Sequence, residues 1–154
     1  MDDFKRLTLI VEAVKYCKKV KGMGMPASCY TKALREPIFF LWELRFTKKK
    51  IEAAQYRSKA AVGMTYGKGE LIYDHCVPFN YLQDELLGIE LITTDSVSKV
   101  LERHGATCLI TKDEDKALND AGLSQKMPRG WDEKNHLARY HSVNIDVVCN
   151  SSDI

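Results

Sequence analysis

The sequence lacks paired cysteines, long apolar runs and complete catalytic signatures, and each absence excludes a class of protein. Its five cysteines are odd in number and none stands in a Cys-x-x-Cys pair, which argues against a disulfide framework. No run approaches the roughly 18 to 20 apolar residues of a membrane span, and the first residues carry no signal-peptide pattern. We therefore expect a cytoplasmic protein with reduced, mostly buried thiols and no membrane partner.

Hydrolase and metal patterns are also missing. The sequence contains no Gly-x-Ser-x-Gly and no cysteine in a recognisable Cys-His setting. His75 and Cys76 are adjacent, so on a strand they would point to opposite faces. His136 and His141 are not spaced to place two imidazoles on one helical face. We predict neither a zinc site nor a bound cofactor.

The size and composition of the chain indicate one folded unit. At 154 residues it is long enough for one domain with a core and too short for two ordinary ones. Hydrophobic residues make up 45% and charged residues 29%, which is typical of an ordered globular domain. We expect a single domain over residues 1–150, followed by a frayed tail, 151–154.

Charge is distributed unevenly along the chain. Residues 1–70 hold 15 Lys and Arg against 7 Asp and Glu, a net charge of +8, whereas residues 71–154 hold 8 against 14, a net charge of −6. A basic helical half, 1–68, and an acidic α/β half, 69–150, would form a dipolar surface that can face a polyanion with one side. In the alternative, the two halves lie against each other and partly neutralise.

Helical periodicity and caps predict most of the secondary structure. Phe4, Leu7 and Val11 begin the apolar stripe of a first helix, which Gly22 breaks. Pro37 is expected to end or kink a second helix and to open a third, a reading we favour over a strand. Further helices are expected over 78–88, 94–105, 111–122 and 132–142, and strands over 70–74, 106–110 and 144–148. The predicted fold is α+β, a mostly helical single domain with a small three-stranded sheet.

The stretch from Arg45 to Lys59 is the most basic part of the chain. Glu52 is its one acid, and Tyr56 lies among the cations. A basic helix that carries an aromatic ring can bind phosphates with its cations and stack the ring on a base, although a solvated helix face has the same pattern. The candidate nucleic-acid-binding residues are Arg45, Lys48, Lys49, Lys50, Tyr56, Arg57 and Lys59.

The pair Asp74-His75 is a candidate catalytic site. A strand that ends in Asp-His-x-x-Pro resembles the first half of the HNH nuclease motif. The resemblance implies that Asp74 binds Mg²⁺ or Mn²⁺ and that His75 activates water for attack on a phosphodiester. The chain departs from the motif where a helix is expected to begin at Pro78 in place of a loop. A histidine at a strand end can also be purely structural.

Three segments of the second half carry a broader resemblance. They are ELIYDHCVPFNYLQDELL, TCLITKDEDKALNDAGLSQKMPRGWD and ARYHSVNID. Together they are similar to an uncharacterised group of small bacterial and phage-borne proteins. The resemblance implies a mobile-element or defence-related setting and carries no activity with it.

A supporting polar cluster is expected at one edge of the sheet. If the three strands share one sheet, His75, Lys112 and Arg139 could approach one another there. In the alternative, Lys112 begins a helix and Arg139 pairs with a nearby acid.

Three functions follow from these patterns. The leading prediction is a binding or regulatory module that acts near nucleic acid or on a nucleic-acid-processing enzyme, such as a phage or defence-related inhibitor. The alternative is a metal-dependent HNH-like nuclease that uses Asp74 and His75. The third is a partner that binds protein through its acidic half or an exposed aromatic patch.

Overall fold

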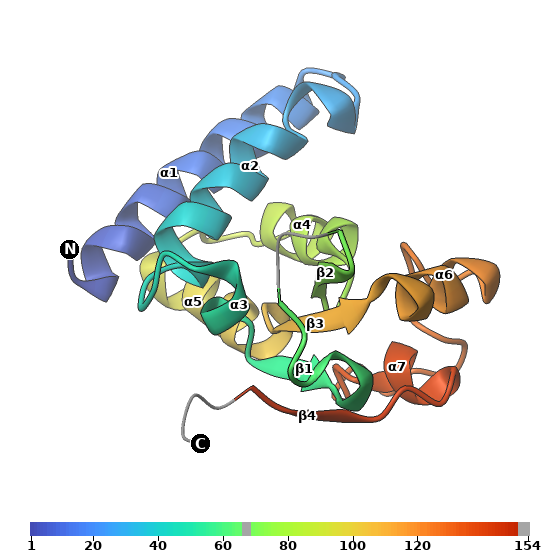
Figure 1. The fold of residues 1–154 in the computed structure, drawn as a ribbon. Coiled ribbons are helices and arrows are strands. Elements are labelled where there is room, and N and C mark those ends of the chain that lie inside the picture. The colour runs from blue at the N-terminus through green and yellow to red at the C-terminus, as the bar shows by residue number, and fades with distance from the viewer. Residues whose placement is uncertain (66–68, 151–154) are drawn as a thin grey trace.

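The computed structural model describes residues 1–65 and 69–150 and has the predicted α+β architecture. A pair of helical segments lies side by side above a small sheet (Figure 1). Further helices lie between this pair and the sheet, and others lie around the sheet. The tail 151–154, expected to fray, lies outside the described residues. Within the described ranges, no helix is both long and apolar enough to cross a membrane.

Helix α1 (Asp3–Gly22) confirms the first predicted helix. It begins at Asp2, whose side chain accepts a hydrogen bond from the Lys5 backbone N–H at 2.8 Å. Lysines in its last turn lie at the negative end of the helix dipole. A short turn, η1 (Ala27–Cys29), then leads into the second helix of the pair. The stripe that α1 buries against its neighbours consists of Ile10, Val11, Val14 and Cys17.

A π-helix continues the second helix of the pair without a break. Helix α2 (Thr31–Pro37) runs into η2 (Ile38–Glu43), where the Leu44 N–H donates to the Phe39 carbonyl, five residues back, at 3.0 Å. Pro37 has no N–H, so the α-helical ladder is interrupted at this position. The expected change at Pro37 is confirmed, but the segment that follows has the wider π form.

The sheet has four strands, one more than predicted. They are β1 (Tyr56–Ser58), β2 (Leu71–His75), β3 (Thr107–Thr111) and β4 (Val147–Cys149). Their order is β2-β3-β1-β4. β1 pairs parallel with β3 and antiparallel with β4, and β2 pairs antiparallel with β3. The strand missing from the prediction is therefore an inner one, which separates β3 from β4.

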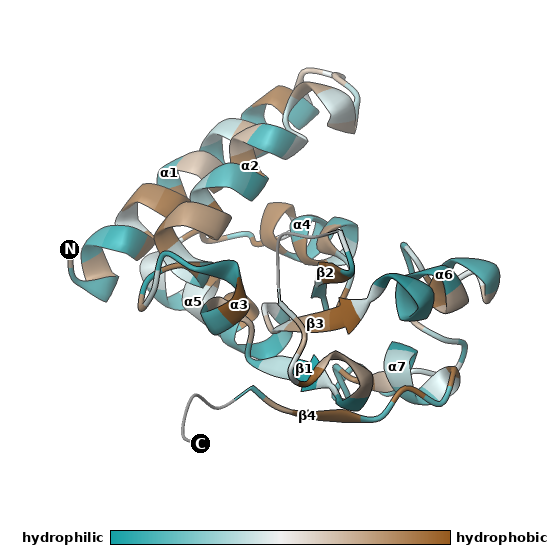
Figure 2. Cartoon of the chain, in the orientation of Figure 1, coloured by the Kyte–Doolittle hydropathy of each residue, from teal (hydrophilic) through white to brown (hydrophobic). Residues whose placement is uncertain are grey.

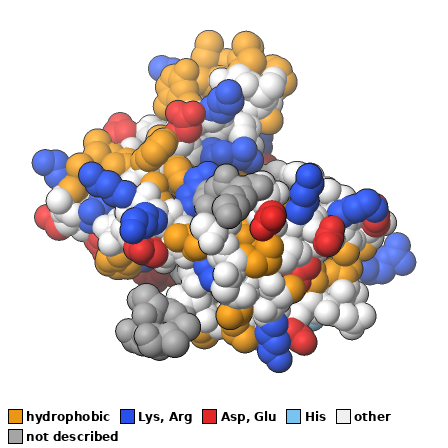
Figure 3. Space-filling model, viewed as in Figure 1, with side chains coloured by type: hydrophobic (Ala, Val, Ile, Leu, Met, Phe, Trp, Pro, Cys, Tyr) orange, Lys and Arg blue, Asp and Glu red, His pale blue; other side chains and the backbone are white. Residues whose placement is uncertain are grey.

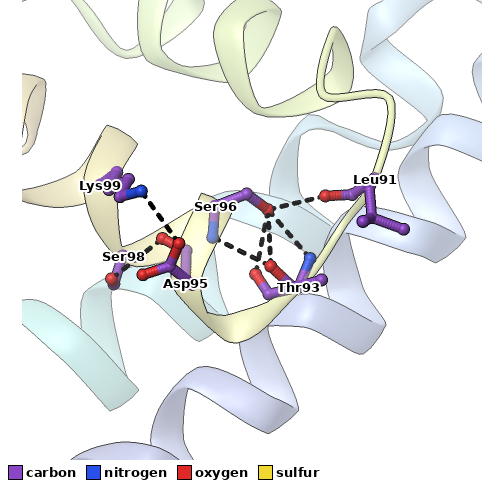
Figure 4. Close-up of polar contacts among 6 residues, drawn as sticks. All are labelled: Leu91, Thr93, Asp95, Ser96, Ser98 and Lys99. Carbon is purple, nitrogen blue, oxygen red and sulfur yellow. Dashed lines mark hydrogen bonds and ion pairs between the residues drawn. The ribbon is translucent and has the colours of Figure 1, made fainter.

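Reciprocal caps begin two of the helices in the second half. At the first of them, the Thr93 N–H donates to Ser96 Oγ at 2.9 Å and the Ser96 N–H donates to Thr93 Oγ1 at 3.1 Å (Figure 4). Thr111 and Glu114 form the predicted capping box in the same way. The helices not yet named are α3 (Lys50–Ala53), η3 (Lys59–Ala61), α4 (Phe79–Leu87), α5 (Thr94–His104), α6 (Lys112–Asp120) and α7 (Ala138–Ser142).

The last predicted helix, 132–142, is wrong over its first half. Only α7 is helical, because Asp132 Oδ1 accepts the backbone N–H groups of Lys134 and Asn135, both at 2.9 Å, and so forms a turn. Glu133, inside that turn, has a φ of 63°, in the left-handed region.

Two hydrophobic clusters hold the fold together. The first joins α1, α2 and η2 to α4 and α5. The second lies around β3 and α7, and Tyr56 of β1 packs against it. The central strand β3 is strongly hydrophobic, whereas most of α6 is hydrophilic (Figure 2). The first cluster therefore contains residues from both halves of the chain, the net basic half and the net acidic half. The second cluster is built mainly from the acidic half, and Tyr56 joins it from the basic half.

The basic stretch from Arg45 to Lys59 is not the helix that its composition suggested. It contains a loop, the single turn α3, strand β1 and the start of η3. Tyr56 belongs to an inner strand, so its ring does not stand on a basic helix face. On the face drawn in Figure 3, Lys and Arg side chains alternate with Asp and Glu and form no continuous basic patch.

Candidate functional site

A pocket of about 360 Å³ opens between the helical pair and the end of β2. Ligand pockets in proteins have volumes of roughly 300 to 1,000 Å³, so this one has room for a small ligand or one nucleotide of a strand. We name it the His75 pocket. Its lining includes Arg35, Phe39, Lys50, Tyr73, His75 and Phe79.

Glu43, at the end of the π-helix, holds two side chains of β2. Its Oε2 lies 2.9 Å from His75 Nε2, and its Oε1 accepts a hydrogen bond from the Tyr73 hydroxyl at 2.8 Å. The Glu43 side chain is only 5% exposed, so both contacts are shielded from water. Burial, together with the Glu43 charge, raises the pKa of Tyr73, which keeps its proton and acts as the donor.

These contacts assign the tautomer of His75. A carboxylate only accepts hydrogen bonds, so Nε2 must carry the proton that it donates to Glu43. In the neutral ring, Nδ1 then has the lone pair. Nδ1 forms no hydrogen bond with the described residues and is not among their buried unpartnered atoms, so it contacts solvent. The ring is therefore oriented as a general base whose accepting nitrogen is accessible.

Aromatic rings flank the imidazole, and each is in contact with a cation. The His75 ring centroid lies 6.1 Å from that of Tyr73 and 5.7 Å from that of Phe79. Lys50 Nζ lies 5.8 Å from the Tyr73 centroid, and Arg35 Cζ lies 5.0 Å from the Phe79 centroid. Lys50 Nζ is also 5.1 Å from the Phe39 ring. The pocket thus combines two cations, aromatic surface and a potential base, and its lining also includes the acids Glu36 and Asp74.

Asp74, the neighbour of His75, belongs to a buried network. Its Oδ2 accepts hydrogen bonds from Arg139 Nη1 at 2.9 Å and from the Tyr140 hydroxyl at 2.7 Å. The Arg139 side chain is 1% exposed and also donates to the carbonyl oxygens of His75, Cys76 and Leu123. The structure therefore brings Asp74, His75 and Arg139 together, and Arg139 fixes the backbone on which His75 sits.

The donor set does not fit the divalent metal that the HNH resemblance implies. Asp74 Oδ2 already accepts two hydrogen bonds from protein groups. Among residues 1–65 and 69–150, no three His, Cys, Asp or Glu side chains are grouped so that they could hold a metal ion. We therefore derive no chemical step through a metal.

Lys112 does not join the cluster predicted for it. Because β2 and β3 are antiparallel, His75 lies opposite Thr107, and Leu71 lies opposite Thr111. Lys112 follows Thr111, and its backbone N–H donates to the Glu70 carbonyl at 3.0 Å. It therefore lies at the far end of β2, about 17 Å from His75, since Glu70 and His75 are five residues apart at the rise of an extended strand.

The predicted nucleic-acid-binding residues are dispersed. Arg45 covers the Trp42 ring at 3.9 Å and donates to the Trp42 carbonyl. The Tyr56 hydroxyl lies 3.0 Å from His136 Nε2. Lys59 faces Asp146 at 4.0 Å. Lys48 and Lys49 are exposed, Arg57 is partly buried on β1, and Lys50 lines the His75 pocket.

Sequence reasoning missed the residues that complete the pocket. The missed residues are Glu43 at the end of a helix, Tyr73 in a strand and Phe79 at the start of a helix. Each is surrounded in sequence by apolar residues, so the pattern predicted core positions there. The sequence offered one signal for this site, which is the acid Glu43 at the end of the apolar run IFFLWE. An acid that is buried with such a run needs a polar partner.

Comparisons of the chain with protein-family models, with curated proteins and with solved structures gave no match.

Proposed function

We propose that the protein is a binding module for single-stranded nucleic acid and that the His75 pocket receives one nucleotide of the strand. The proposal rests on the row of side chains from Lys50 through Tyr73, His75 and Phe79 to Arg35. Cations in such a row bind phosphates, and the partly exposed rings of Phe39 and Tyr73 can stack on a base without strong sequence preference, whereas Phe79 is buried in the core. Of the residues predicted from the basic stretch, Lys50 is the one that lines this pocket.

Binding to labelled single-stranded RNA and DNA, measured by fluorescence anisotropy across a salt series, tests the proposal. The affinity is expected to fall steeply with salt, and Lys50→Ala or Arg35→Ala should each reduce the salt slope by about 1. Lys59→Ala is the matched control, because Lys59 lies in the same basic stretch but faces Asp146.

Absence of binding at about 50 mM salt would exclude direct contact with nucleic acid. The module would then act through a protein partner, such as a nucleic-acid-processing enzyme. Equal loss of affinity in Lys59→Ala and Lys50→Ala would instead move the interface away from the pocket.

The accessible Nδ1 of His75 favours cleavage of a phosphodiester as a second candidate function. His75 Nδ1 would take the proton of the attacking water as its oxygen bonds to phosphorus. The leaving oxygen would depart with the bonding electrons and take a proton from solvent. Glu43 would stabilise the imidazolium so formed.

Cleavage is tested on the same oligonucleotides with EDTA and, separately, with Mg²⁺ or Mn²⁺. His75→Ala should abolish cleavage and leave most of the binding, whereas His141→Ala, at an exposed histidine, should change neither. Equal cleavage by wild type and His75→Ala would end this candidate. Activity only with added metal would favour the HNH-like alternative.

A further inference from the structure

A second pocket, of about 470 Å³, lies between α4 and the loop after α6. We name it the Trp131 pocket; its lining includes Tyr81, Asp84, Lys126, Trp131, Asp132 and Glu133. Gln125 lines both this pocket and the His75 pocket, so the two adjoin, but the six residues named here belong only to the Trp131 pocket. Its charge also differs, because its lining has three acids and one lysine, whereas the His75 pocket has two cations, Arg35 and Lys50, and two acids, Glu36 and Asp74.

Two aromatic rings form a corner of this pocket. The centroids of Tyr81 and Trp131 lie 5.2 Å apart, and the planes are inclined by 76°. The ring of His104, which is 3% exposed, packs against both, with centroid distances of 5.7 Å to Tyr81 and 5.5 Å to Trp131. Trp131 is further fixed by its Nε1–H, which donates to the Asn135 carbonyl at 2.8 Å. The corner is therefore preorganised, with partly exposed ring surface in the lining.

The carboxylates at this corner have cations nearby, because Arg103 and Lys134 line an adjoining pocket together with Asp132 and Glu133. Among the described residues, Asp84, Asp132 and Glu133 form no ion pair, and Lys126 in the same lining pairs with none of them. Glu133 Oε1 accepts the Tyr81 hydroxyl at 3.1 Å, which places one carboxylate at the ring edge. Three acids beside two electron-rich rings attract a cation and repel phosphate.

We infer that the Trp131 pocket binds the guanidinium group of an arginine side chain presented by a protein partner. A planar guanidinium can stack on an indole or phenol face while its N–H groups reach carboxylates in the same plane. A lysine ammonium is more strongly hydrated and lacks the planar stacking surface. The ligand is thus basic, opposite in charge to the strand proposed for the His75 pocket.

The probe is N-acetyl-arginine amide, titrated into the ¹⁵N-labelled protein while the Trp131 indole N–H resonance is followed. The resonance, identified by its loss in Trp131→Phe, is expected to shift with a dissociation constant of about a millimolar. The citrulline analogue, which is neutral and nearly isosteric, should produce no saturating shift. Equal shifts with arginine and citrulline, or with arginine and lysine amides, would overturn the inference.

Variants locate the contact. Asp84→Asn and Glu133→Gln are each expected to weaken arginine binding by about two- to fivefold, the effect of one exposed ion pair. Glu90→Gln, at an exposed acid outside the lining, should leave the affinity unchanged. If Glu90→Gln weakens binding as much as the lining variants, the pocket is not the site.

Discussion

The Glu43 carboxylate lies 2.9 Å from His75 Nε2, although the two residues are 32 positions apart in the chain. The contact joins the end of the π-helix to the end of β2. A π-turn has a wider bore than an α-turn and shifts the angular position of the residues that follow. The change of helix type at Pro37 therefore helps to decide which side of η2 Glu43 occupies.

The Glu43 contacts should contribute measurably to stability. Glu43→Ala leaves the Tyr73 hydroxyl and His75 Nε2 without their acceptor, and is expected to lower the free energy of unfolding by about 1 to 3 kcal/mol. Tyr73→Phe should cost about 1 kcal/mol in wild type and much less in Glu43→Ala. Urea denaturation of the double-mutant cycle measures the coupling. A coupling near zero would mean that the two side chains do not interact in solution.

Asp74 is expected to matter more for folding than for metal binding. Asp74→Ala leaves the buried Arg139 guanidinium without its counter-charge, which is expected to cost about 3 to 5 kcal/mol. Asp74→Asn keeps an acceptor and should cost less. The melting temperatures and urea midpoints of both variants check this order. A stable Asp74→Ala protein would return Asp74 to the list of candidate ligands.

Local signals predicted the fold wherever they were self-contained. Pro37, Gly88, Gly105 and the Thr111 cap act within a few residues, so helix ends were found within one or two positions. Strand β1 was not predicted, because it has only three residues and lies inside a cationic run. It forms by pairing with β3 and β4, and these long-range contacts cannot be recognised from the neighbouring sequence.

The Thr111 cap allows a test of such a local signal. Thr111→Ala removes the acceptor for the Glu114 N–H at 3.1 Å and is expected to lower stability by about 1 kcal/mol. Thr111→Ser keeps the hydroxyl and serves as the control. Thermal unfolding by circular dichroism gives the difference. If the serine variant loses as much as the alanine variant, the cost arises from the methyl group on β3 and not from the cap.

The candidate site was predictable only in part, because its chemistry depends on long-range pairing. Asp74 and His75 stood out as adjacent polar residues at a strand end. Their partners could not be assigned, because Glu43 comes long before β2 in the chain and Arg139 long after it. Lys112 was misplaced for the same reason: the strand direction, and not the residue type, decides which end of β2 it approaches.

One buried histidine, His104, and one partly buried histidine, His136, should make the protein less stable in mild acid. Burial lowers the pKa of His136, and burial followed by the Arg103 charge lowers the pKa of His104, both from an ordinary value of 6.5. In the unfolded chain these side chains take up protons near that value, whereas the folded protein resists protonation. Stability is therefore complete above about pH 6.5 and is lost as the pH falls below it.

His136→Gln isolates this effect, because glutamine can accept the Tyr56 hydroxyl without titrating. The loss of unfolding free energy between about pH 7 and pH 5.5 should be smaller in this variant than in wild type. Burial raises the pKa of Glu85, which has the opposite effect at lower pH, so measurements belong above about pH 5.5. An unchanged slope in His136→Gln would mean that His136 is protonated to the same extent in the folded and unfolded states and does not contribute to the loss of stability in acid.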